Sequence, residues 1–134
     1  MTQTPETQAP GGKILLVEDS KFLSVATERA LLRHGHQVLC AADGEEALRV
    51  ALAQAPDLIL LDMMLPKMTG PDVLKALKSS PATRAIPVMV LTSLSQKNAR
   101  QLEKDGAIGF FEKNDLMLQT GPDSLASAID KILK

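Results

Sequence analysis

Apolar residues occur in two kinds of run along this chain. Short stretches of successive apolar side chains alternate with longer stretches in which apolar residues recur every three or four positions. The short stretches predict five strands, at residues 13–17, 37–42, 57–61, 87–91 and 107–111. Because these residues are apolar in succession, we expect both faces of every strand to be covered.

The longer stretches predict five helices, at residues 20–35, 44–55, 70–80, 95–106 and 122–134. The buried stripe expected for the first helix is Leu23, Ala26, Ala30 and Leu31, and that for the last is Leu125, Ala128, Ile129 and Ile132. Gly35 is suited to end the first helix. The helix at 95–106 has few apolar residues, so it should dock weakly and shift easily.

Strict alternation of buried strands with helices predicts an α/β fold with a parallel sheet covered by helices on both faces. In such open sheets, ligands bind at the carboxyl ends of the strands. Those ends carry Glu18, Asp19, Asp62, Thr92 and Lys113. Each has an ordinary explanation alone, because acids begin helices, threonines begin loops and lysines are usually solvated. Together they predict a site on one edge of the sheet.

Three neighbouring carboxylates repel one another unless a cation neutralises them. Oxygen ligands without histidine or thiolate favour Mg²⁺, which keeps open positions for water and a substrate phosphate. An aspartate is able to attack phosphorus and form an acyl phosphate if metal and cation compensate the donor's charge. The pattern therefore predicts phosphoryl chemistry at Asp62, with Mg²⁺ and Lys113 supplying positive charge.

Composition limits the class of protein. A chain of 134 residues with 45% hydrophobic composition suits one domain, and a net charge of -1 gives no broad attraction to nucleic acid or anionic membrane. Residues 1–12 are polar and predict a disordered leader before a domain at 13–134, without a signal peptide or transmembrane stretch. The single cysteine, Cys40, is predicted to be a small core residue and favours a reducing cytoplasm. His34 and His36 flank a turn and are predicted to be solvated.

Five motifs resemble the receiver domains of two-component response regulators: LLVEDS, ADGEEAL, LILLDMMLPKMTG, VMVLTS and GAIGFFEK. The resemblance runs from about Lys13 to the C-terminus and implies a flavodoxin-like, doubly wound sheet of order 2-1-3-4-5. It further implies that Glu18 and Asp19 bind Mg²⁺ together with Asp62, the phosphoacceptor, and the backbone carbonyl of Met64.

The resemblance also implies a switch. In the family, the hydroxyl at the position of Thr92 moves toward the phosphoryl group, and the lysine at the position of Lys113 pairs with that group. The aromatic side chain at the position of Phe110 fills the space that the hydroxyl side chain leaves. The surface expected to change comprises the helix at 95–106, the strand at 107–111 and the last helix. A plain core phenylalanine remains the alternative for Phe110.

Five positions bear on how closely the chain follows the family. Asn114 stands where the family usually has proline after the lysine, which leaves the reach of Lys113 open. Met64 and Leu94, two residues after the phosphoacceptor and the threonine, are apolar and predict slow self-dephosphorylation. Pro66 and Gly70 match family positions that shape the following loop, although ordinary turn residues would look the same.

The expected function is a phosphoacceptor signalling domain, not an enzyme. A histidine kinase, a phosphotransfer protein or a small phosphodonor would modify Asp62, and a downstream protein would read the change. Its expected form is a stand-alone regulator of the chemotaxis or relay type, monomeric or dimeric on activation. A phosphorylation-independent pseudo-receiver is the alternative, and a phosphotransferase or phosphatase for free substrates is the third class.

Overall fold

The computed structural model describes residues 12–92, 100–101, 103–113 and 121–133. Its centre is a sheet of five parallel strands in the order β2-β1-β3-β4-β5. The sequence pattern predicted the parallel sheet, and the family resemblance implied the strand order. The strands are β1 (Lys13–Val17), β2 (Gln37–Ala41), β3 (Leu58–Asp62), β4 (Val88–Thr92) and β5 (Gly109–Glu112). The doubly wound α/β class is therefore confirmed.

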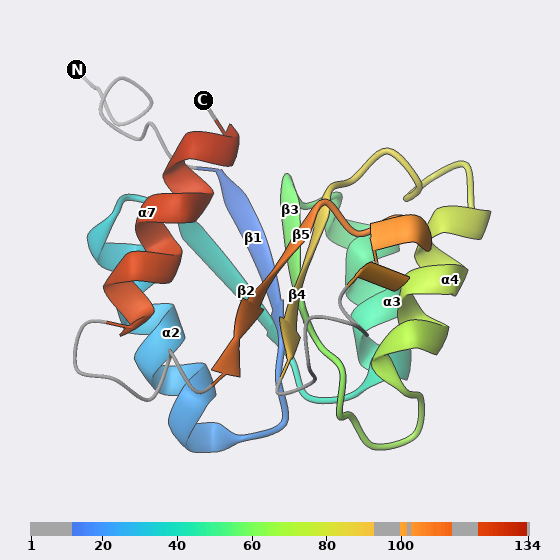
Figure 1. The fold of residues 1–134 in the computed structure, drawn as a ribbon, viewed down its shortest axis with the longest axis horizontal. Helices are drawn as coiled ribbons and strands as arrows, with labels where there is room; N and C mark the ends of the chain where they lie inside the picture. Colours follow the sequence, from blue (N-terminus) through green and yellow to red (C-terminus); the bar gives the residue numbers. More distant parts are fainter. Residues whose placement is uncertain (1–11, 93–99, 102, 114–120, 134) are drawn as a thin grey trace.

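Helices cover both faces of the sheet (Figure 1). They are α2 (Lys21–Arg33), α3 (Gly44–Gln54), α4 (Gly70–Ser79) and α7 (Gly121–Leu133). Helices α2 and α7 lie side by side on one face, and α3 and α4 on the other. Residues 100, 101, 103 and 104 are also helical, but most of the helix predicted at 95–106 lies outside the described residues. Over the described ranges, no helix has the length and apolar character needed to cross a bilayer.

Polar side chains fix where three helices begin. Ser20, Asp43 and Thr69 precede α2, α3 and α4, and each side chain accepts a hydrogen bond from a backbone N–H in the first turn. At the other end of α2, Gly35 has a φ of 90°, a left-handed conformation that glycine adopts without steric cost. The predicted end of that helix is therefore confirmed.

Successive residues along the strands belong alternately to two separate hydrophobic clusters, one on each face of the sheet. The first, on the α3 and α4 side, includes Leu15, Val17, Ile59, Leu61, Val88 and Val90. The second, on the α2 and α7 side, includes Ile14, Leu16, Leu58, Leu60, Met89 and Leu91. Both faces of β1, β3 and β4 are thus buried, which explains why their sequences are apolar at successive positions.

The expectation that every strand is covered on both faces holds only in part for the two edge strands, whose side chains pack against both clusters mostly without being fully buried. No residue of β5 is fully buried, and only Ala41 is fully buried in β2. Cys40 is exposed on β2 and is not a core residue. Apolar succession identifies a strand, but the strand's place in the sheet decides how much of it is covered.

The predicted helical stripes need small corrections. In α2, Thr27 is buried where Ala26 was expected, and Ala26 is half-buried. In α7, Ala126 is buried, whereas Ile132 is 36% exposed. Both differences amount to a modest rotation of the buried face, because the angle at which a helix meets the sheet is set by tertiary packing.

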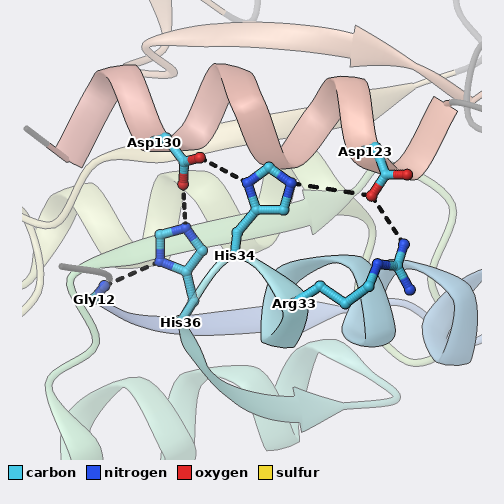
Figure 2. A network of polar contacts seen from close by, with 6 residues as sticks. All are labelled: Gly12, Arg33, His34, His36, Asp123 and Asp130. Atoms are coloured by element: carbon cyan, nitrogen blue, oxygen red, sulfur yellow. Dashed lines mark hydrogen bonds and ion pairs between the residues drawn. The ribbon is translucent and has the colours of Figure 1, made fainter. Parts of the chain in front are cut away.

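The prediction that His34 and His36 are solvated is wrong, because both side chains contact Asp130 (Figure 2). The side chain of His36 is 1% exposed, and its Nε2 lies 2.6 Å from Oδ1 of Asp130 in α7. His34 Nδ1 lies 2.7 Å from Oδ2 of the same carboxylate. Since His36 Nδ1 accepts the Gly12 N–H at 3.0 Å, Nε2 carries the proton of the neutral ring and donates to Asp130. One carboxylate thus connects α7 to the turn after α2 and to the start of β1.

Replacing Asp130 with alanine should destabilise the fold. Asp130→Ala leaves two imidazoles without their acceptor, one of them buried, and we expect the free energy of unfolding to fall by about 2 kcal/mol. Urea denaturation measures this change. The matched control is Asp123→Ala, on the same helix, because Asp123 pairs with Arg33 at 2.8 Å with more than half of each side chain exposed, and its contact with His34 Nε2 is longer, at 4.0 Å (Figure 2). A surface pair of this kind contributes less than about 1 kcal/mol, so equal losses in the two variants would contradict the assignment.

The contribution of Asp130 should disappear in acid. Burial raises the pKa of this carboxyl, but hydrogen bonds from His34 and His36 outweigh burial and hold the pKa below its usual value of 3.8. A carboxylate with a lowered pKa stabilises the fold above its unfolded pKa and stops doing so as the pH falls through its folded pKa. The stability difference between wild type and Asp130→Ala should therefore shrink below pH 3.8; an undiminished difference in denaturation at acid pH would be inconsistent with this.

Candidate functional site

Asp62 is the last residue of β3, and its side chain is completely buried. The strand is buried along its whole length and lies between β1 and β4, so its end is held rigidly. Asp62 Oδ1 accepts the Met64 N–H at 3.1 Å, and Oδ2 accepts Lys113 Nζ at 3.1 Å. The carboxylate is therefore fixed on both oxygens.

Glu18 and Asp19 follow β1 at the same edge of the sheet. The Glu18 N–H donates to Ala41 O at 3.0 Å, which continues the bonding between β1 and β2. Glu18 is 4% exposed, whereas Asp19 is exposed. Ligand oxygens of Glu18, Asp19 and Asp62 all lie within 4.8 Å of one another. The three acids predicted from the strand ends are thus brought together.

Lys113 follows β5 and reaches across the site. Its Nζ lies 3.1 Å from Asp62 Oδ2 and 3.4 Å from both carboxylate oxygens of Glu18. The sequence left the reach of this lysine open because of Asn114, which lies outside the described residues. In the structure the ammonium group contacts both buried acids.

Burial and mutual repulsion perturb the charges of the site. Burial, assisted by the negative charge of Asp62, raises the pKa of Glu18 to about 7, although the Ser20 N–H and Lys113 oppose the rise. Burial alone lowers the pKa of Lys113, but the attraction and hydrogen bonding of Asp62 and Glu18 outweigh it and raise that pKa. One lysine therefore compensates only part of the negative charge.

The acidic residues suit a hard divalent cation. Glu18 Oε1 is buried and accepts no hydrogen bond from any described residue, although Lys113 lies nearby. A buried carboxylate oxygen without a hydrogen bond is costly unless a ligand compensates it. The exposed carboxylate of Asp19 opens the cluster to solvent, as Mg²⁺ requires because it retains several water ligands. The residues present thus fit the predicted metal.

Thr92 and Phe110 lie at neighbouring strands of the same edge. Thr92 ends β4, is 1% exposed and pairs in register with Glu112, two residues after Phe110. Phe110 is half-buried and packs against the first hydrophobic cluster. Thr92 therefore lies at the sheet edge that carries the acids, and Phe110 lies on the neighbouring strand; Leu94 and the other residues of 93–99 lie outside the described ranges.

The loop after β3 is held by a close approach that the sequence indicated only as a turn. The Gly70 N–H donates to Met63 O at 3.1 Å, and a Cβ at Gly70 would lie 2.5 Å from Met63 Cα and 2.7 Å from Asp62 O. Any side chain at Gly70 would therefore displace the backbone that carries Asp62. Lys67, with a φ of 70°, makes the left-handed bend between them.

Ser20 is a functional residue that sequence reasoning missed. Its N–H donates to Glu18 Oε2 at 3.0 Å, and its hydroxyl caps α2. The signal was present, because a serine directly before a helical pattern is a typical N-cap. The start of α2 is thereby linked to the orientation of Glu18.

Comparison with known proteins agrees with this geometry. Residues 14–119 match the family model of the response regulator receiver domain. The chain is 41% identical over 133 residues to a gliding motility regulatory protein of Myxococcus xanthus, covering 96% of this chain and 16% of that protein's length. Other relatives are likewise covered only in part, so this chain spans a minor share of the first curated relatives.

Two solved structures show the same fold. The chemotaxis response regulator CheY4 of Vibrio cholerae superposes with a TM-score of 0.81 at 28% identity, covering 91% of this chain and 98% of that one. The Mn²⁺-bound form of response regulator Rcp1 gives a TM-score of 0.75 at 28% identity, covering 90% and 92%. The chain belongs to the response regulator receiver domain family, whose members are modules of two-component signalling and not enzymes.

Substituting Gly70 should disturb the site through the backbone. Gly70→Ala forces apart backbone atoms that cannot rotate away, and we expect a loss of about 2 kcal/mol in the free energy of unfolding. Urea denaturation checks this. Gly109→Ala is the matched control, since a Cβ there has no neighbour within 4 Å and should change stability by less than about 0.5 kcal/mol. If both variants unfold like wild type, the close approach is not a constraint.

Mg²⁺ should stabilise the protein through the acidic cluster. At ten times its dissociation constant, a ligand of the folded state adds about 1.4 kcal/mol, which corresponds to a melting temperature roughly 5 °C higher. Thermal denaturation with and without MgCl₂ measures the shift.

Asp19→Asn should remove most of that shift, because it deletes the exposed carboxylate of the cluster. Asp72→Asn, an exposed acid in the first turn of α4, should leave the shift intact. A shift equally large in Asp19→Asn would mean that Mg²⁺ binds elsewhere.

Proposed function

We propose that this chain is a phosphoacceptor signalling domain in which Asp62 receives a phosphoryl group. The observation that carries the proposal is the convergence on Asp62 of an ammonium group at 3.1 Å and two further carboxylates within 4.8 Å. A fully buried aspartate at the end of a rigid strand, next to a cation and a metal-binding cluster, is suited to attack phosphorus. Family membership supports the same conclusion.

The transfer is a displacement at phosphorus. A carboxylate oxygen of Asp62 forms the new O–P bond, while the P–N bond of a phosphohistidine, or the P–O bond of acetyl phosphate, breaks and the electron pair leaves with the donor. Lys113 pairs with the negative charge on the phosphoryl oxygens. Mg²⁺, when bound, neutralises the same oxygens. Before transfer the ammonium group pairs with the Asp62 carboxylate at 3.1 Å and orients it.

Three acids and one backbone group would hold the metal. Glu18 and Asp19 supply carboxylate oxygens, Asp62 shares its own, and Met64 offers its backbone carbonyl. Glu18 Oε1 supports this assignment, because this buried oxygen has an ion-pair contact with Lys113 at 3.4 Å but accepts no hydrogen bond from the described residues, and Mg²⁺ would complete its coordination. The exposed side of the cluster, at Asp19, leaves room for water and for the donor.

Phosphorylation would be read through Thr92 and Phe110. The added acceptor oxygens draw the Thr92 hydroxyl toward the phosphoryl group, and Phe110 repacks into the space behind it. Phe110 has no hydroxyl group, so its two positions differ in packing alone. The surface formed by residues 95–106, β5 and α7 then changes and alters binding of a downstream protein, while a histidine kinase or phosphotransfer protein supplies the phosphoryl group.

The acyl phosphate should be long-lived. Met64 is 66% exposed beside the phosphoacceptor and offers no polar group to orient an attacking water. Leu94, the other apolar residue expected to influence hydrolysis, lies outside the described residues. Slow decay suits a regulator whose signal persists after the kinase stops.

Incubation with acetyl phosphate followed by intact mass measurement tests the proposal. Wild type should gain a single phosphoryl group only when Mg²⁺ is present, Asp62→Asn should gain none, and the control Asp72→Asn should behave as wild type. If a folded wild type that binds Mg²⁺ gains no phosphoryl group, a phosphorylation-independent pseudo-receiver becomes the better description.

A further inference from the structure

Two adjacent methionines at the phosphorylation site have opposite environments. Met63 is 4% exposed and packs in the first hydrophobic cluster, whereas Met64 is 66% exposed. The other methionines that the structure describes, Met68 and Met89, are half-buried and buried respectively. Among the described thioethers, Met64 is therefore the one open to solvent.

Met64 is also fixed close to the phosphoacceptor. Its backbone N–H donates to Asp62 Oδ1 at 3.1 Å. The residue before it is held by Gly70, whose N–H donates to Met63 O and whose Cα position leaves no room for a side chain. The loop therefore cannot withdraw Met64 from the site without breaking these contacts. A chemical change of this exposed side chain therefore takes place on a backbone position that is bonded to the reacting carboxylate.

We propose that Met64 is an oxidation site whose sulfoxide shortens the lifetime of the aspartyl phosphate. The proposal rests on the proposed function of Asp62. It assigns to an exposed apolar side chain a second, redox-dependent role, in which peroxide-class oxidants end the signal sooner.

The oxidation is a two-electron oxygen transfer. A lone pair on Met64 Sδ attacks one oxygen of hydrogen peroxide, the S–O bond forms, the O–O bond breaks, and the departing hydroxide takes up the remaining proton to leave as water. Sulfur is oxidised and peroxide is reduced. Methionine sulfoxide is reducible back to the thioether, so the change is reversible.

The physical effect follows from polarity. The thioether is a weak acceptor, whereas the sulfoxide oxygen is a strong one, so oxidation introduces a strong polar acceptor on the residue whose backbone N–H is bonded to the phosphoacceptor. A water held by that oxygen is positioned for attack on phosphorus. One hydrogen bond of ordinary net strength corresponds to roughly a tenfold rate change. The backbone carbonyl of Met64 is unaltered, so Mg²⁺ binding should be unchanged.

The first experiment maps oxidation without reference to phosphorylation. The 134-residue chain is treated with hydrogen peroxide, quenched with free methionine, digested and analysed by mass spectrometry at successive times. Met64 should be converted several times faster than Met63, which serves as the internal control. Conversion of Met63 as fast as Met64 would overturn the proposal whatever the role of Asp62.

The second experiment measures decay of the phosphoprotein by intact mass after removal of acetyl phosphate, in the presence of Mg²⁺. Mild oxidation should accelerate decay roughly tenfold in wild type and leave the non-oxidisable Met64→Leu unaffected. Without oxidant, Met64→Gln, which carries a permanent polar acceptor, should decay faster than Met64→Leu.

The outcomes separate this inference from the function on which it rests. Failure of unoxidised wild type to accept a phosphoryl group refutes the phosphoacceptor role itself. Normal phosphorylation with a decay rate that oxidation does not change, or that changes equally in Met64→Leu, refutes only the role of Met64. Acceleration confined to proteins that retain Met64 supports it.

Discussion

The structure depends on the neutralisation of one completely buried carboxylate. Asp62 ends a strand that is covered on both faces, so its charge is stable there only with a partner held in place. Lys113 is that partner, and it comes from beyond β5, two strands away. The same ammonium group reaches Glu18 after β1. A single lysine thereby links the ends of three strands, β1, β3 and β5.

Much of this arrangement was predictable from the sequence, because the relevant signals are local. Successive apolar residues identified all five strands, and a parallel sheet brings the carboxyl ends of its strands to one edge, so Glu18, Asp19, Asp62, Thr92 and Lys113 had to converge. The order of the strands came from resemblance to the family and not from the apolar pattern. The contacts of Lys113 with Asp62 and Glu18 were not predictable from the sequence, because a flexible side chain next to Asn114 could adopt several positions.

The features that were mispredicted all depend on contacts between distant residues. His34 and His36 contact Asp130, which lies 96 and 94 positions further along the sequence, so the sequence around the histidines gives no sign of this acceptor. Cys40 lies in an apolar run but on an edge strand, where the sheet covers less of it. Local pattern gives element type, while neighbours supplied by the fold decide burial and charge.

The division of the interior by the sheet bears on how the sequence is free to vary. The two hydrophobic clusters lie on opposite faces and share strands but not side chains, so a loss of volume at Leu61 is repairable by growth at Val73 or Leu74 but not by growth at Leu125. Compensating substitutions should therefore arise within one cluster, while changes in different clusters add their effects. The two hydrophobic clusters should therefore accumulate substitutions independently, provided that the positions of the strand ends are preserved.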